Sequence, residues 1–147
     1  IRNIHGFMAG EHGESQFAVW SSVHVSAMAM VSYCAKRGIV IDKDELVQDI
    51  VSSGAQVIKR KGVTNFAIAA IVAELCATIM GDRGSIFNVT SLLDNYYGIS
   101  DVCISVPCIL GKGGVKEHIA YDFNEDEMVR LKASARSIRN FMDDLKI

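Results

Sequence analysis

The residues best suited to chemistry lie in segment 10–15, which reads GEHGES. Its histidine, His12, has a glutamate and a glycine on its N-terminal side and a glycine and a second glutamate on its C-terminal side. Glycine costs conformational entropy, so two glycines this close together indicate a backbone bent to present the side chain between them. Because an imidazole accepts and donates a proton near neutral pH, His12 is a candidate acid/base. The residue types alone also allow an ordinary solvated or backbone-bonded loop histidine.

Other kinds of site have weaker support. Glu11 and Glu14 flank His12, but neighbouring residues in an extended loop point apart and do not easily ligate one ion, so no metal site is expected. The glycine-rich turn at 111–114 is followed by strand-type residues, and no complete nucleotide fingerprint occurs, so we expect no phosphate binding there. The four cysteines never take C-x-x-C spacing, and we expect buried free thiols in a reducing, cytoplasmic setting. These cysteines are Cys34, Cys76, Cys103 and Cys108.

Length and composition limit the class of protein. The chain has 147 residues, which is one domain in size. Half of the residues are hydrophobic and only one is proline, so some apolar surface is expected to face a partner. The formal net charge is only -2 and the charges are mixed along the chain, so neither nucleic acid nor a membrane is assigned as a partner.

The pattern of hydrophobic residues predicts strands before and after the segment 10–15, which places His12 at a strand end. Further along the chain, three β-type segments are joined by short turns and are expected to form an antiparallel meander, with Pro107 at a strand end or edge. The predicted strand segments are 4–9, 17–25, 85–97, 102–106 and 115–122.

Three helices are expected. An Asp–Glu pair spaced three residues apart predicts a helix that starts near Lys43, and an Asn–Glu pair of the same spacing predicts a final helix after Asn124. Between them, Phe66–Met80 is apolar on nearly every face and is too short to span a bilayer, so it is expected to be a central core helix. The fold class is therefore α+β, a twisted antiparallel sheet packed with long helices.

Three linked motifs resemble the C-terminal substrate domain of the L-lactate and L-2-hydroxyacid dehydrogenases. They are GEHGES at 10–15, QFAVWS at 16–21 and KGVT at 61–64, which opens the apolar helix. The resemblance covers the whole chain, 1–147, and implies that the Rossmann dinucleotide-binding domain of the family lies upstream and outside it. The chain starts at Ile1, inside what looks like a strand, which fits the later part of a longer protein.

The resemblance also implies roles for individual residues. His12 would take the hydroxyl proton of a 2-hydroxy acid while hydride leaves for the nicotinamide of NAD, and the product would be a 2-oxo acid. Thr64 would lie against the substrate side chain, and Ile68 would pack on the nicotinamide. From residue type alone, Thr64 is instead a helix cap and Ile68 a core residue. Ala55 stands where many lactate dehydrogenases have tyrosine, so L-2-hydroxyisocaproate dehydrogenase is an alternative to lactate dehydrogenase, as is malate dehydrogenase.

His5 resembles the effector histidine of bacterial lactate dehydrogenases that fructose 1,6-bisphosphate activates. Its alternative is a strand-end histidine bonded to backbone. An imidazolium can pair with phosphate, and symmetric subunits would bring two such groups around one bisphosphate, so a homo-oligomer, a tetramer, is expected.

The resemblance leaves the site incomplete. The aspartate that orients the histidine and the arginine that holds the substrate carboxylate in this family have no counterpart among the 147 residues. We therefore expect the isolated chain to be inactive. From another class of function, the chain could act only as a non-catalytic oligomerisation or effector-binding module.

Overall fold

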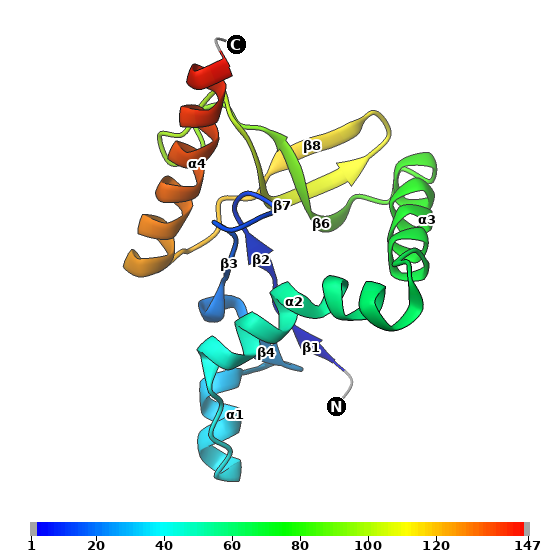
Figure 1. Cartoon of the computed structure of the whole chain (residues 1–147). Helices are drawn as coiled ribbons and strands as arrows, with labels where there is room; N and C mark the ends of the chain where they lie inside the picture. The colour runs from blue at the N-terminus through cyan, green and yellow to red at the C-terminus, as the bar shows by residue number, and fades with distance from the viewer. Residues whose placement is uncertain (1–2, 146–147) are drawn as a thin grey trace.

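The computed structural model describes residues 3–145 and contains four helices and three small antiparallel sheets, which confirms the α+β class. The expectation that Ile1 lies within a strand falls outside the described residues. The largest sheet has the order β6-β7-β8 and is the predicted meander (Figure 1). Its strands are β6 (Ser85–Leu92), β7 (Cys103–Gly111) and β8 (Gly114–His118).

Helix α4 (Glu125–Leu145) supplies the other main wall of the hydrophobic core. Its Leu131 and Ala135, one turn apart, pack into the same buried cluster as Ile104 and Val106 of β7. The predicted cap is confirmed, since Asn124 Oδ1 accepts a hydrogen bond from the Glu127 amide at 2.9 Å and Glu127 Oε2 accepts one from the Asn124 amide at 3.1 Å.

The expectation for Pro107 was wrong, because this proline lies inside β7, the central strand of the meander. The Pro107 carbonyl accepts from the Ile119 amide at 2.9 Å, just beyond the end of β8. The polar backbone groups of one strand residue point to the same side, so the missing N–H faces the region where β8 has ended. The ladder to β6 therefore continues without interruption.

The two continuous strands predicted before and after loop 10–15 are also wrong in detail. The structure has short pieces that form one sheet of order β1-β4-β5 and one pair, β2-β3. A 3-10 turn at Trp20–Ser22 interrupts the second strand, because Ser22 Oγ donates to the Val19 carbonyl at 2.6 Å and competes with ladder hydrogen bonds. The pieces are β1 (Ile4–His5), β2 (Met8–Ala9), β3 (Phe17–Ala18), β4 (His24–Val25) and β5 (Met28–Ala29).

Three helices follow: α1 (Met30–Arg37), α2 (Lys43–Lys61) and α3 (Phe66–Met80). The start of α2 is confirmed, since Asp42 Oδ1 accepts from two amides of the first turn at 3.0 Å. Helix α1 was missed because it is short and its N-cap, Ala29, makes no side-chain cap bond.

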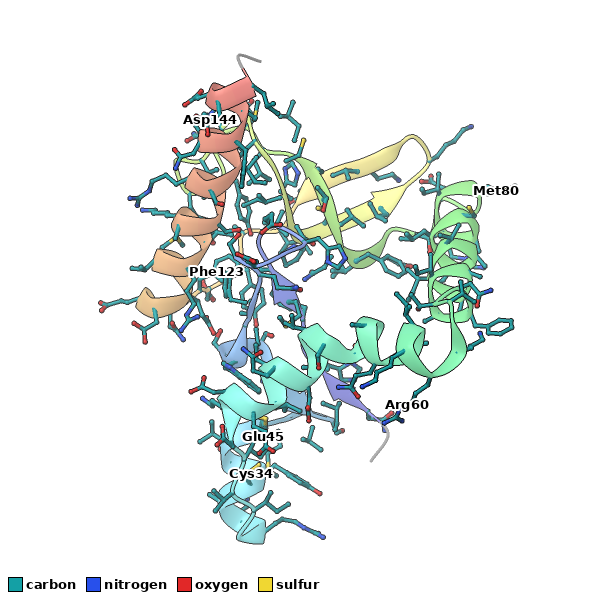
Figure 2. The ribbon with its side chains drawn as sticks, in the orientation of Figure 1. Cys34, Glu45, Arg60, Met80, Phe123 and Asp144 are labelled. Carbon is teal, nitrogen blue, oxygen red and sulfur yellow. The ribbon has the colours of Figure 1, made fainter. Side chains whose placement is uncertain are left out.

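The expectation that α3 is a central core helix was wrong within the described residues. Thr78 is the only buried residue of α3. Met80, labelled in Figure 2 at the C-terminal end of this helix, is 86% exposed. An apolar sequence predicts burial but not the identity of the covering surface. Helix α2 has no buried residue. No helix within residues 3–145 is long and apolar enough to cross a membrane.

The cysteines are free, as expected, but only partly buried. Cys108 is buried and Cys34 is half-buried, whereas Cys76 and Cys103 are exposed. Cys76 lies on helix α3, most of whose residues are exposed within the described chain. The expectation of burial was therefore wrong for this cysteine, as it was for the helix.

Candidate active site

Loop 10–15 leaves β2 and is fastened at once to the central strand of the meander. Gly10 and Ser105 exchange two backbone hydrogen bonds, of 3.1 and 2.9 Å. Gly10 has a φ of +95°, a conformation that favours glycine, and a Cβ there would lie 2.8 Å from Ser134 Oγ. The predicted bend is thus present, and close approach to α4 also requires a glycine.

The glutamate before His12 folds back over the loop. Ser15 donates to Glu11 Oε2 from its hydroxyl at 2.7 Å and from its amide at 3.2 Å. A Cβ on Gly13 would lie 1.9 Å from Glu11 Oε1, so the second glycine provides the space for this carboxylate. The carboxylate is therefore used inside the loop, which argues against its serving as a metal ligand. Within residues 3–145 no group of three His, Cys, Asp or Glu side chains is placed to hold a metal ion.

His12 lies at the tip of this loop, with its side chain exposed. Beside it is a cavity of about 240 Å³ whose walls carry polar side chains from β6, β7 and the loop. Two of these side chains also fix the backbone, because Asn88 Nδ2 donates to the Met8 carbonyl at 2.8 Å and Gln16 Nε2 donates to the Gly13 carbonyl at 2.9 Å. The arrangement gives an imidazole that solvent or a substrate can reach, on a backbone held from several sides.

Thr64 and Ile68 lie in another part of the molecule. Thr64 is half-buried just before α3, and it does not cap the helix, because the N-cap is Asn65, which itself makes no side-chain cap bond. Ile68 is 59% exposed and is therefore not a core residue within this chain. Neither residue lines the cavity beside His12. The described structure thus leaves both side chains available to a further surface.

His5 is exposed on β1 and stands directly opposite His24 in the antiparallel pair β1–β4. Directly opposed residues of a strand pair project to the same face, so this face carries two imidazoles. His24 Nδ1 is hydrogen-bonded to the Ser22 carbonyl at 2.8 Å. The pairing of these two histidines was not predicted, because the 3-10 turn Trp20–Ser22 that precedes β4 was not predicted.

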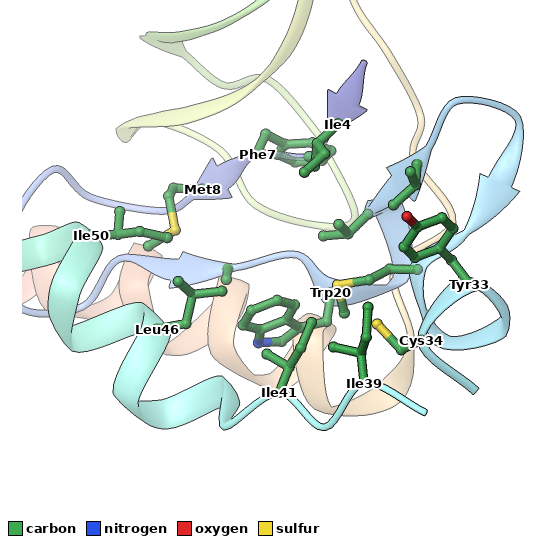
Figure 3. A pocket seen from close by; sticks show the side chains of 15 residues that line it. Ile4, Phe7, Met8, Trp20, Tyr33, Cys34, Ile39, Ile41, Leu46 and Ile50 are labelled. Carbon is green, nitrogen blue, oxygen red and sulfur yellow. The ribbon is translucent and has the colours of Figure 1, made fainter. Parts of the chain in front are cut away.

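Another cavity, of about 510 Å³, is lined almost entirely by apolar side chains (Figure 3). Trp20, Leu46 and Ile50 stand on one side of it, and Tyr33 and Cys34 of α1 on another. It lacks the convergent polar groups that orient a small polar substrate, and His12 is not among its lining residues.

A partly buried polar cluster that the sequence did not reveal lies in the meander. Ser91 Oγ is 2.8 Å from His118 Nε2 and 3.7 Å from Cys108 Sγ, and this thiol donates to the Val106 carbonyl at 3.2 Å. Burial raises the pKa of the Cys108 thiol, so it stays protonated at neutral pH and is a poor nucleophile. Burial likewise raises the pKa of Tyr96, whose hydroxyl donates to the Ile119 carbonyl. The cluster therefore reads as core structure.

The meander is backed by a capped C-terminal helix, and the histidine loop is hydrogen-bonded to both. The sequence profile described as lactate/malate dehydrogenase, alpha/beta C-terminal domain, matches residues 2–146, so the chain belongs to this family. Among curated proteins it is similar to the L-lactate dehydrogenase of Treponema denticola, with 35% identity over 98% of this chain and 47% of the relative. The L-lactate dehydrogenase of Clostridium botulinum is 34% identical over 97% of this chain and 46% of the relative.

Solved structures give the same result. A lactate dehydrogenase from a Medee basin deep-sea metagenome library matches with a TM-score of 0.91 and 27% identity, over 99% of this chain and 48% of that one. The L-lactate dehydrogenase of Clostridium thermocellum matches with a TM-score of 0.83 and 31% identity, again over 99% and 48%. The chain thus spans about half the length of the relatives it matches.

Proposed function

We propose that this chain is the substrate-binding and acid/base domain of an NAD-dependent L-lactate dehydrogenase, which interconverts lactate and pyruvate. One observation carries the proposal: His12 is exposed beside a polar cavity, on a loop that is bonded to both β7 and α4. Similarity to L-lactate dehydrogenases over nearly the whole chain supports it.

The interconversion of lactate and pyruvate requires one group from this chain that can accept and donate a proton. In lactate oxidation NAD supplies the hydride acceptor. Neutral His12 accepts the hydroxyl proton, because hydride loss from a protonated alcohol would leave a cationic carbonyl. In the reverse direction the imidazolium returns that proton to the carbonyl oxygen of pyruvate as hydride arrives at carbon. Each direction therefore starts from one defined protonation state of His12.

The beginning of α3 would provide the remaining contacts. Ile68 is apolar and 59% exposed, which suits packing on a nicotinamide ring, and Thr64 at the α2–α3 junction would contact the side chain of the substrate. Ala55 of α2 is much smaller than the tyrosine found at this position in many lactate dehydrogenases, so the pocket for the substrate side chain would be larger. A branched 2-hydroxy acid is therefore an alternative substrate. Malate is the other alternative.

The proposal is tested in the full-length protein. We expect His12→Gln to lower kcat with pyruvate and NADH by about 10²–10⁴-fold, because a general acid/base typically contributes that much. The matched control is His118→Gln, which removes an imidazole of β8 that does not line the cavity beside His12 and should leave kcat per folded enzyme within about twofold. Turnover by His12→Gln at the level of the parent would refute the acid/base role. Pyruvate, 2-oxoisocaproate and oxaloacetate assayed side by side decide the substrate.

For regulation we propose that His5 contributes to a fructose 1,6-bisphosphate site in a homotetramer. The exposure of His5 and the second imidazole of His24 on the same face favour an anion there. His5→Gln should abolish activation by the bisphosphate, and unchanged activation would contradict the proposal. A non-catalytic effector-binding role would appear as bisphosphate-dependent association of the 147-residue chain in the ultracentrifuge, with no turnover in the full-length protein.

We place the enzyme in the cytoplasm. The exposed thiols of Cys76 and Cys103 are free, which suits a reducing compartment.

A further inference from the structure

The hydrogen bonds around loop 10–15 include a buried side chain from the opposite end of the sequence. Ser134 of α4 is completely buried, and its Oγ accepts a hydrogen bond of 2.7 Å from the Glu11 amide. The same Oγ lies 3.0 Å from Ser15 Oγ. Ser15 in turn donates from its hydroxyl to Glu11 Oε2 at 2.7 Å. The contacts therefore start and end on one residue, Glu11.

Only one assignment of hydrogens satisfies all of these contacts when the carboxylate is ionised. An ionised carboxylate only accepts, so the Ser15 hydroxyl hydrogen points at Glu11. The bond between the two hydroxyls then takes its hydrogen from Ser134, whose oxygen is left to accept from the Glu11 amide. The result is a closed ring with one direction: Glu11 N–H to Ser134, Ser134 to Ser15, and Ser15 to the Glu11 carboxylate. Each hydroxyl donates once and accepts once, and such chains strengthen cooperatively.

This ring brackets His12. Glu11 immediately precedes it and Ser15 follows it by three residues, so both sides of the histidine are tied to a single atom of α4. The close fit extends to the glycine, because Gly10 leaves only enough room for Ser134 Oγ beside its Cα. We infer that Ser134 is the positioning residue for His12: it acts through the loop, touches no substrate, and holds the imidazole in its working orientation. This inference rests on the acid/base role proposed above.

A misplaced catalytic group loses rate because the reacting atoms no longer meet at the required distance, and an error of 1 Å can cost about 10²-fold. Removing the Ser134 hydroxyl opens the ring and leaves the Glu11 amide without its acceptor. The loop keeps its two backbone bonds to Ser105, so it stays attached to β7 while its far side is released. The effect is therefore expected on chemistry rather than on nucleotide binding.

The experiment compares Ser134→Ala with Ser137→Ala in the full-length enzyme. Ser137 lies one turn later on the same helix and takes no part in the ring. We expect Ser134→Ala to lower kcat by about 10–100-fold, to leave the Kd for NADH unchanged, and to raise the primary isotope effect with 2-deuterated lactate. Ser137→Ala should match the parent in all three. A mere loss of stability would lower the active fraction without changing the isotope effect per active site.

Two further measurements keep the outcome decisive. Should Ser134→Ala fail to fold, Ser15→Ala opens the same ring from its other hydroxyl and should show the same kinetic pattern. Amide hydrogen exchange at Glu11 reports the ring directly and should accelerate in Ser134→Ala but not in Ser137→Ala. Parental kcat and isotope effect in a folded Ser134→Ala enzyme would overturn the positioning role. Absence of turnover in the parent, or a His12→Gln enzyme with the same kcat as the parent, would instead overturn the proposed function. Neither result would change the hydrogen-exchange outcome.

Discussion

The two sides of this molecule differ in how they bury their apolar residues. The meander β6–β8, helix α4 and the segment around loop 10–15 share one continuous hydrophobic cluster. Helices α2 and α3 contribute almost nothing to it, although α3 is the most apolar helix in the chain. Figure 1 shows α3 and α4 on opposite sides of the meander. Hydrophobic sequence and hydrophobic burial are therefore separate properties, and the second depends on what lies alongside.

The candidate site is divided along the same line. His12 belongs to the tightly packed side, where hydrogen bonds from α4 and β7 fix its loop. Thr64 and Ile68 belong to the uncovered side. A base has to be held rigidly, whereas side chains that meet a nucleotide or a substrate have to remain accessible until that partner arrives. The following comparisons test this division, beginning with the largest expected difference.

The core should respond far more strongly than α3 to the loss of side-chain volume. Leu131→Ala removes a fully buried side chain of α4 and should lower the free energy of unfolding by about 2–5 kcal/mol. Ile71→Ala on α3, where the side chain is 57% exposed, should lower it by less than about 1 kcal/mol. Urea denaturation of the 147-residue chain measures both. Equal effects would show that the two helices are packed alike.

Glycine-to-alanine substitutions should change the free energy of unfolding in opposite directions on the two sides of the molecule. Gly10→Ala forces a Cβ to 2.8 Å from Ser134 Oγ at a φ of +95°, and we expect a loss of about 1–3 kcal/mol. Gly54→Ala lies within α2 with open space around it, so better helix propensity should add about 0.5–1 kcal/mol. Thermal unfolding of both variants checks the signs. Stabilisation by Gly10→Ala would contradict the close packing of loop 10–15 on α4.

Removing the N-cap side chain should destabilise the protein more at α4, in the packed core, than at the uncovered helix α3. Asn124→Ala removes the acceptor for the Glu127 amide and should cost about 1 kcal/mol. Asn65→Ala, at the N-cap of α3, removes only an exposed contact with Lys61 and should change stability by a few tenths of a kcal/mol. Circular dichroism during urea titration follows both. A cost for Asn65→Ala as large as that for Asn124→Ala would mean that α3 depends on its cap after all.

The smallest expected effect concerns the link between α3 and the β7–β8 turn. A hydrogen bond from Lys116, supported by the Lys112 amide, lowers the pKa of Asp82 below its ordinary value of 3.8. Since the folded state has the lower pKa, this contribution is complete above about pH 4 and disappears as the pH falls through the folded value. Asp82→Asn should therefore be slightly less stable than the parent at pH 6, and the two should converge as the pH falls through the lowered pKa of Asp82. A difference that persists in acid would exclude the ion pair as its source.

Local signals in the sequence predicted much of the fold. The Asp42 and Asn124 caps and the glycine turn at 111–114 fixed the starts of α2 and α4 and the β7–β8 hairpin, because each depends on residues within a few positions of one another. The predictions failed where distant segments decide the outcome. The strand segment 17–25 breaks at a serine turn, and Pro107 is tolerated in a central strand because β8 has already ended.

For the site, the sequence by itself predicted the bent backbone of loop 10–15 and made His12 a candidate acid/base, because both predictions depend on the types of a few neighbouring residues. Only the tertiary structure decided what holds that loop. Ser134 lies more than a hundred residues away, and an exposed helix position and a buried bridging serine look the same in a sequence. The cover for α3 is likewise set by packing between surfaces, which no local pattern encodes.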